Sequence, residues 1–191
     1  MFLEFDNFIE AIEENQRIEL KQPCNWDEKI FAKDILALSN VRDGGYILVG
    51  VEQLNNTFIR KGVTPERAQT FDIEKMRDQM EKFSDPCVNF RVDPRKDKED
   101  RLYIIIYVLE FDEIPVICKR DSGDTKKGHI YYRNRTRRWE SAIVSNSYDM
   151  KDIIERSAVK MMKKYRELGL KPESVETNYR SKYDEELEGL L

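Results

Sequence analysis

The segment 37–51, ALSNVRDGGYILVGV, limits the fold of this chain more than any other stretch. It contains the end of an apolar helix, then a turn at Gly44 and Gly45, then a nearly continuous apolar run. Glycine adopts the backbone angles that such a turn requires. A strand that is apolar on both faces is typical of the centre of a sheet. The segment therefore predicts a helix that leads directly into a buried central strand.

Hydrophobic spacing predicts helices and strands along the rest of the chain. Helices are expected over about 5–14, 25–40, 72–83 and 149–168, with Asn25 and either Thr70 or Asp72 as capping residues. Strands are expected over about 17–22, 46–51, 58–62, 88–92, 101–111, 115–119 and 130–135. Their irregular interleaving is typical of the α+β class. We expect a mixed sheet of about six strands with flanking helices, plus a C-terminal amphipathic helix.

A chain of 191 residues is long enough to bury one good core and short for two. We therefore expect one domain over residues 1–146. Apolar residues at helical spacing over 147–170 predict a helix that packs on this domain or forms the seam of a homodimer. Residues 171–191 are rich in Glu and Tyr, and we expect a loosely ordered tail.

The cysteines and the histidine limit which cofactors and which cellular compartment are expected. Cys24, Cys87 and Cys118 lie far apart, no CxxC occurs, and His129 is the single histidine. This set does not make a Cys/His zinc site, so we expect no zinc. Reduced thiols are typical of a cytoplasmic protein, which is the expected location. No apolar run approaches the roughly 20 residues of a membrane span, so we expect no membrane partner.

Charged residues gather around the first expected strand. Glu19 and Lys21 share one of its faces because side chains alternate along a strand, and Glu14 precedes them. Carboxylate oxygens suit Mg²⁺ or Mn²⁺, and a lysine beside them can neutralise charge that develops on a phosphate. The alternative is that Glu19 and Lys21 simply pair on a solvated sheet face, where such pairs contribute little.

Four sequence features follow one another in order. The first is E-x4-E-x-K at Glu14, Glu19 and Lys21, the second is the helix ending in ALSN, and the third is GGYILVGV. The fourth comprises Ile114-Pro115, Gly128 and the segment HIYYRNRTRRWESA. Together, over roughly 5–141, they resemble the Schlafen AlbA-like domain family, which occurs in bacterial regulators and at the core of Schlafen proteins.

The resemblance implies a site and a chemistry. In family members with nuclease activity, two glutamates and an aspartate cut RNA, chiefly transfer RNA, with a divalent ion. It implies Glu14, Glu19, Lys21 and Glu52 as catalytic residues, and Glu14, Glu19 and Glu52 as ligands of Mg²⁺ or Mn²⁺. Glu52 stands where the family has aspartate, and its longer side chain changes the geometry.

The glycine pair could also be taken for a nucleotide site. A phosphate-binding P-loop needs GxxxxGK followed by Ser or Thr, with a strand before it and a helix after it. Gly44 and Gly45 instead follow a helix and precede a strand. The pattern favours a helix cap and tight turn, so ATP is not expected.

Basic residues concentrate late in the chain. Between Lys119 and Arg138 there are eight lysines and arginines against two aspartates, although the formal net charge of the chain is -4. Arginines beside aromatic rings suit a phosphate backbone and unstacked bases. The expected nucleic-acid-binding residues are Lys126, Lys127, Tyr131, Arg133, Arg135, Arg137 and Arg138. The alternative is that this strand pairs with the acidic remainder of the chain.

Three hypotheses from different classes follow. The first is a metal-dependent endoribonuclease, that is a hydrolase, acting on structured RNA such as transfer RNA. The second is a non-catalytic DNA- or RNA-binding regulatory module. The third is an interaction domain that dimerises through its last helix. Binding of nucleic acid is common to the first two, and the preference for RNA comes from the family resemblance.

Overall fold

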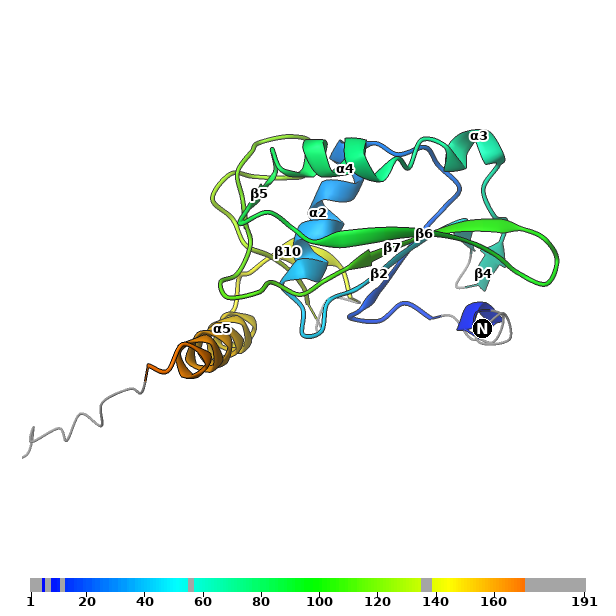
Figure 1. Ribbon diagram of the computed structural model, residues 1–191. Coiled ribbons are helices and arrows are strands. Elements are labelled where there is room, and N and C mark those ends of the chain that lie inside the picture. Colours follow the sequence, from blue (N-terminus) through cyan, green and yellow to red (C-terminus); the bar gives the residue numbers. More distant parts are fainter. Residues whose placement is uncertain (1–4, 6–7, 11–12, 55–56, 135–138, 171–191) are drawn as a thin grey trace, which may run out of the picture. The chain divides into compact units, whose positions relative to one another are not determined.

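The computed structural model of the chain describes residues 5, 8–10, 13–54, 57–134 and 139–170 (Figure 1). Contacts divide the chain into a first unit, residues 1–160, and a second unit, residues 161–191. The elements that build the sheets and the candidate site all belong to the first unit.

The main sheet has four strands in the order β1-β2-β7-β6. These are β1 (Ile18–Lys21), β2 (Gly45–Val49), β7 (Leu102–Val108) and β6 (Phe90–Lys96). β1 runs parallel to β2, and the other neighbours are antiparallel, so the sheet is mixed. The strand GYILV is central, as its apolar run predicts, and β1 forms one edge of the sheet.

Three two-stranded sheets accompany it. They pair β3 (Val51–Leu54) with β4 (Thr57–Arg60), β5 (Ser84–Asp85) with β8 (Ile117–Cys118), and β9 (Tyr131–Arg133) with β10 (Ser141–Ile143). The predicted α+β class is confirmed. The expected strands near 58–62, 115–119 and 130–135 lie in these small sheets, because each finds its partner in a neighbouring short segment and not at an edge of the main sheet.

Gly50 divides the apolar run that the sequence suggested was one strand. Its φ is +121°, and a Cβ there would lie 2.7 Å from Cδ1 of Tyr103 and 3.1 Å from Cα of Gly62. The N–H of Gly50 still donates to the carbonyl of Lys21, at 2.9 Å. The chain therefore leaves the main sheet at this residue and enters the β3–β4 hairpin.

Three helices lie between strands in the sequence, namely α2 (Glu28–Ser39), α3 (Pro65–Ala68) and α4 (Ile73–Met80), and α5 (Ser147–Glu167) follows the last strand. Asp72 caps α4 by accepting from the N–H groups of Glu74 and Lys75, as one of the two predicted alternatives requires. The predicted cap Asn25 is wrong for α2. Asp27 has the extended backbone of a cap and accepts from the N–H of Lys29 at 2.9 Å.

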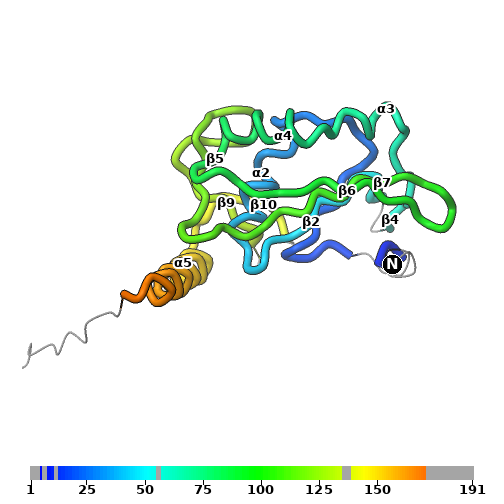
Figure 2. Tube along the Cα trace, in the orientation of Figure 1, coloured from blue at the N-terminus to red at the C-terminus, as the bar shows by residue number. Residues whose placement is uncertain are grey.

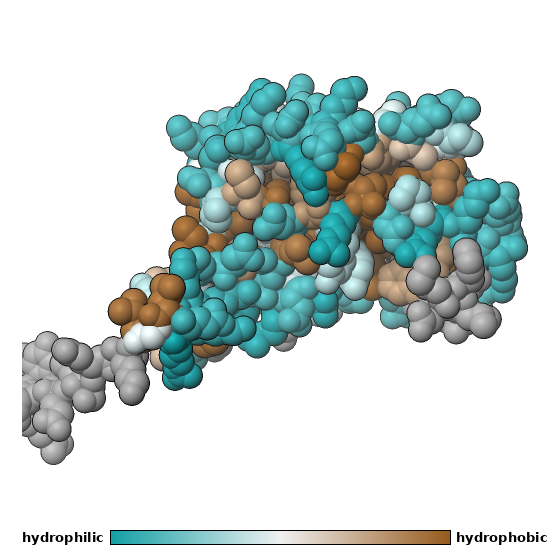
Figure 3. All heavy atoms as spheres, in the orientation of Figure 1, coloured by the Kyte–Doolittle hydropathy of each residue, from teal (hydrophilic) through white to brown (hydrophobic). Residues whose placement is uncertain are grey.

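The two faces of the main sheet have different covers. Ile47 and Ile104 belong to the larger core cluster, together with Phe31 of α2 and Met76 of α4. On the opposite face a smaller cluster includes Leu48, and the N-terminal residues pack on it. Figure 1 shows α2 and α4 on one side of β2, β7 and β6 and the N-terminus on the other. In Figure 3 hydrophobic residues show at the surface in a band between hydrophilic ones.

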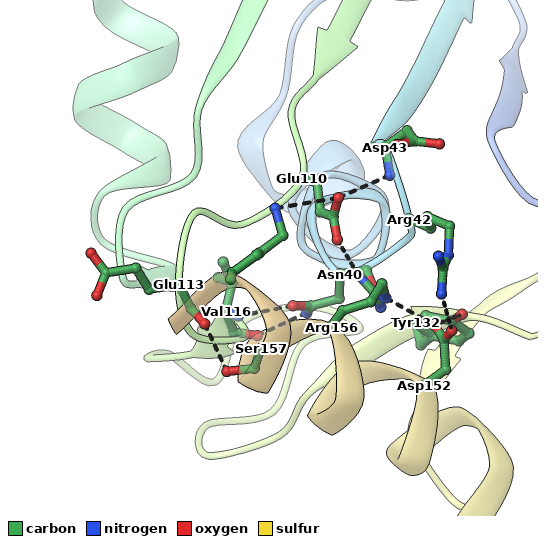
Figure 4. Close-up of polar contacts among 12 residues, drawn as sticks. Asn40, Arg42, Asp43, Glu110, Glu113, Val116, Tyr132, Asp152, Arg156 and Ser157 are labelled. Atoms are coloured by element: carbon green, nitrogen blue, oxygen red, sulfur yellow. Dashed lines mark hydrogen bonds and ion pairs between the residues drawn. The ribbon is translucent and has the colours of Figure 1, made fainter. Parts of the chain in front are cut away.

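The first part of α5 is bound to the core through Arg156, whose side chain is buried (Figure 4). Its guanidinium donates to the carboxylates of Glu110 and Asp152 and to the carbonyl of Asn40. Asp152 also accepts from the hydroxyl of Tyr132 at 2.9 Å. These contacts place residues 147–160 of the helix with the first unit.

The other side of α5 carries exposed apolar side chains, namely Met150, Ile154, Val159, Met162 and Tyr165. The dimer seam expected over 147–170 stays a prediction. Among the described residues, no helix combines the length and the apolar character needed to cross a membrane.

Candidate functional site

A cavity of about 540 Å³ opens beside the edge strand β1, and three residues of the acidic motif line it: Glu14, Glu19 and Lys21. Further lining residues come from α2 (Lys29, Ile30, Lys33, Asp34), from the loop before β9 (Gly123, Asp124) and from the β9–β10 hairpin (Trp139, Glu140, Ser141). Figure 2 shows β9 and β10 running next to α2. The structure therefore brings together the first, second and fourth features of the sequence.

Parallel pairing with β2 sets which side chains of β1 face the cavity. Glu19 lies opposite Ile47, whose side chain is in the core cluster under α2, and Leu20 lies opposite Leu48 in the cluster on the other face. Alternation then directs Glu19 and Lys21 toward α2. Their predicted position on one face is confirmed.

Lys21 lies between two carboxylates. Its Nζ is 2.9 Å from Oε1 of Glu19 and 2.6 Å from Oδ2 of Asp34. Burial alone would lower the pKa of Lys21, but attraction to Asp34 and Glu19 outweighs it and raises the pKa above its ordinary value. Lys21 is therefore a fixed positive charge in the cavity wall.

Asp34 was missed by the sequence reasoning. Asp34 is 3% exposed, although most of the buried residues of its helix are apolar. The sequence does show an aspartate among the apolar residues Ile30, Phe31 and Ile35. A charged side chain at a buried position needs a partner, so this pattern could have pointed to Asp34.

Glu14, unlike Glu19, has no ion-pair partner among the described residues. Its Oε1 accepts from the N–H of Leu20 at 3.4 Å, which is a weak contact. Burial, and next the negative charge of Glu19, raise the pKa of Glu14 above its ordinary value, against the opposing effects of Arg133 and Lys21. A carboxyl group with a raised pKa keeps its proton to a higher pH than an ordinary glutamate, which favours a role in proton transfer.

Arg133 is fully buried, and its guanidinium pairs with the carboxylate of Glu19. It also donates to the carbonyls of Asn15 and Ile18, at 3.0 and 2.9 Å. Arg133 was among the expected nucleic-acid-binding residues, but its buried side chain is not accessible to a ligand in this arrangement. The reason is that the hairpin packs against α2.

Tyr131 is likewise buried, 2% exposed, and its expected contact with a base is wrong. Its hydroxyl accepts from the N–H of Lys126 at 2.8 Å and donates to the carbonyl of Asp124 at 3.2 Å. Tyr131 therefore shapes the segment 119–128, which we call the basic loop. Lys126 and Lys127 are exposed there, and neither has an ion-pair partner among the described residues.

Three of the expected binding residues, Arg135, Arg137 and Arg138, lie outside the described residues. The ends of their segment are described. The N–H of Asn134 donates to the carbonyl of Glu140 at 3.2 Å, and Trp139 has a φ of +63°. The side chain of Trp139 is partly exposed at the cavity.

Glu52 does not join the other acidic residues. It lies on β3, is absent from the cavity lining, and forms an ion pair with Lys61. Nor do the described residues include any group of three His, Cys, Asp or Glu side chains arranged to hold a metal ion. Lys21 fills the space between Glu19 and Asp34 where a cation would compete with it. The predicted ligand set Glu14, Glu19 and Glu52 therefore does not fit a divalent ion in this arrangement.

Comparison with known proteins gives a family match over most of this region. The model of the family described as Schlafen, AlbA_2 matches residues 14–139. No curated protein matches. The match includes the acidic motif, α2, the main sheet and the start of the hairpin at the cavity.

Two solved structures are similar. DIP2311 from Corynebacterium diphtheriae is 16% identical with a TM-score of 0.47, and the aligned part covers 73% of this chain and 27% of DIP2311. The N-terminal domain of a protein from Nitrosomonas europaea, described as related to the ATP-dependent DNA helicase RecG, is 19% identical with a TM-score of 0.47. There the aligned part covers 65% of this chain and 84% of that domain. This chain thus spans about a quarter of the length of the first.

Proposed function

This chain belongs to the Schlafen AlbA_2 family, and on that premise we propose that it binds RNA or DNA through the cavity beside β1 and the basic loop. The family is associated with nucleic acid, which supports the class of partner. The observation that carries the proposal is a partly exposed tryptophan at an acidic cavity, with two lysines on the adjoining loop that have no ion-pair partner among the described residues.

The acidic cavity and the basic loop differ in charge and are therefore expected to contact different parts of the ligand. The cavity has five acidic residues, Glu14, Glu19, Asp34, Asp124 and Glu140, against Lys21, Lys29 and Lys33. A phosphate is repelled from such a floor, so the backbone of the ligand runs along Lys126 and Lys127 outside it. The ring of Trp139 offers a stacking surface to an unpaired base.

The acidic floor suits the polar edge of a base. Carboxylate oxygens accept from amino groups of cytosine and other bases, as aspartate and glutamate do in nucleic-acid recognition. Glu14 and Glu140 are the acidic residues of the cavity without an ion-pair partner among the described residues. We therefore assign the cavity to a base that is unstacked from its neighbours, and the loop to the flanking phosphates.

Binding tests the proposal directly. Fluorescence anisotropy of labelled transfer RNA and labelled single-stranded DNA is measured against wild type and the double variant Lys126→Glu/Lys127→Glu. The variant is expected to lose binding by tenfold or more, since two phosphate contacts become repulsive. The matched control is Lys75→Glu/Lys82→Glu, two exposed lysines on and just after α4. Equal binding by both double variants would refute the assignment.

Cleavage of RNA at the same cavity is the second candidate. The pKa of Glu14 is raised and Lys21 is held as a cation within the same wall, which are the properties of a proton-transfer group and of an electrostatic stabiliser. Transfer RNA is incubated with wild type and Glu14→Gln, with and without added Mg²⁺ or Mn²⁺. Cleavage that the variant lacks supports an endoribonuclease, and equal product from both proteins rejects Glu14 as its catalytic residue.

A further inference from the structure

We propose that the opposite face of the main sheet is a second binding surface, which takes single-stranded nucleic acid by stacking bases on Tyr46 and Tyr107 beside Arg91. It shares no residue with the cavity beside β1. Glu19 and Lys21 face α2, whereas Tyr46 and Tyr107 lie on the side where the N-terminal residues pack. This proposal can therefore be tested independently of the function proposed above.

Register places the key side chains in one row across three strands. Tyr46 of β2 lies opposite Tyr107 of β7, and Tyr107 lies opposite Arg91 of β6. Residues opposite each other on neighbouring strands project from the same face and touch. The row thus presents two aromatic rings next to a guanidinium.

The rings are packed together yet not covered. The ring centroids of Tyr46 and Tyr107 are 4.8 Å apart, with an angle of 45° between the planes, and Phe8 lies 6.4 Å from Tyr46. All three residues are partly exposed. They line a hollow of about 520 Å³, with Phe5, Arg91 and Arg95 among the other lining residues. Aromatic rings at an open hollow are where unstacked bases bind without sequence preference.

The charges of the hollow favour an anion. Arg91 is exposed, and no ion-pair partner for it is found within the described part of the chain. Arg95 pairs with Asp93, its Nε at 2.8 Å and its Nη2 at 2.7 Å from Oδ2. Among the described lining residues two arginines face one carboxylate, so this part of the hollow is net positive on a chain that is acidic in total.

A single strand fits this surface better than a duplex. In a duplex the flat faces of the bases are stacked on each other and cannot reach the tyrosine rings, whereas a single strand can turn them outward. Arginine adds cation–π contact to such stacking and stays charged at all relevant pH values. The partner is therefore a single-stranded stretch of RNA or DNA.

The charge test uses a labelled 20-nucleotide oligo(dT), which has no structure of its own, at low salt. Arg91→Glu is compared with Arg77→Glu, which makes the same charge change at an exposed position of α4 on the other side of the sheet. Arg91→Glu is expected to weaken binding about tenfold, and Arg77→Glu to change it less than twofold. Equal affinities of the two variants would overturn the proposal.

The stacking test keeps or removes the ring at one position. Tyr46→Phe is expected to bind like wild type, and Tyr46→Leu to lose about tenfold, because each base–aromatic contact contributes to affinity. Thermal unfolding by circular dichroism checks that both variants are folded. Equal binding by folded Tyr46→Leu and Tyr46→Phe would overturn the proposal.

Discussion

Arg133 of β9, which is fully buried, forms an ion pair with Glu19 of β1 although 114 positions separate them in the sequence. The same guanidinium donates to the carbonyl of Asn15, just before β1, and to that of Ile18, within β1, so it binds the hairpin to this edge of the main sheet. Glu19 is therefore a structural partner of the hairpin as well as a cavity residue. Any substitution there acts on the shape of the site and on its charge.

Glu19→Gln is expected to destabilise the protein by about 3 to 5 kcal/mol, because it leaves a buried guanidinium without its counter-charge. Urea unfolding followed by circular dichroism measures the free energy of unfolding. The control is Glu140→Gln, an exposed acidic residue of the same cavity, which should change stability by less than about 0.5 kcal/mol. Matching midpoints for the two variants would contradict the structural role.

Glu14→Gln is expected to act in the opposite direction and to stabilise the protein at neutral pH, by up to about 1 kcal/mol. The raised pKa of Glu14 means that the folded state binds more protons than the unfolded state just above the ordinary glutamate pKa of about 4.3. Stability is therefore lost as the pH rises through this window, and below it the penalty vanishes. The difference in midpoint temperature between the variant and wild type should be positive at pH 7 and disappear near pH 4. A difference that does not change with pH would be inconsistent with this cause.

Gly50→Ala is expected to destabilise the protein by about 3 kcal/mol or more. The substitution adds backbone strain at a positive φ, and the new Cβ overlaps Tyr103 at the branch from the main sheet into β3. Gly128→Ala is the matched control. Its φ is also positive, at +80°, but no atom lies within 4 Å of the added Cβ, so only about 1 to 2 kcal/mol is expected. Chemical unfolding of both variants separates strain from overlap, and equal losses would rule out the overlap.

Lys126 and Lys127 should contribute to the salt dependence of nucleic-acid affinity. Lys126→Gln/Lys127→Gln is expected to reduce the slope of log affinity against log salt concentration by about 2, that is about 1 for each lysine that no longer neutralises a phosphate. Lys75→Gln/Lys82→Gln should leave the slope as in wild type. Titrations of labelled transfer RNA over a series of salt concentrations give both slopes. An unchanged slope in the loop variant would place the phosphates elsewhere.

The sequence predicted the features that depend on local pattern. The apolar run after Gly45 gave the central strand, Asp72 was one of two expected caps, and alternation placed Glu19 and Lys21 on one face. Each of these follows from the period of a strand or from the hydrogen bonds at a helix end, which a few neighbouring residues determine.

Features that depend on distant packing were not accessible in the same way. Arg133 has the pattern of a member of an exposed basic strand, and its burial follows only from the contact of the hairpin with α2. Asp34 enters the site because α2 packs on the face of the main sheet toward which Lys21 projects. Glu52 leaves it because Gly50 turns the chain into a separate hairpin, where Lys61 neutralises the carboxylate. The family resemblance was sufficient for the fold and the acidic motif, but not for the third carboxylate.

The long loop closed by Glu19 and Arg133 also bears on how the cavity forms in time. β1, α2 and β2 are consecutive, so Lys21 can meet Asp34 early, within a short stretch of chain. The hairpin must first overcome the entropy cost of closing a loop of more than a hundred residues. Interactions made after the folding transition state alter the unfolding rate and leave the folding rate nearly unchanged. Substitution of Arg133 should therefore speed unfolding in stopped-flow experiments, and the acidic wall from β1 and α2 would assemble before the hairpin closes it.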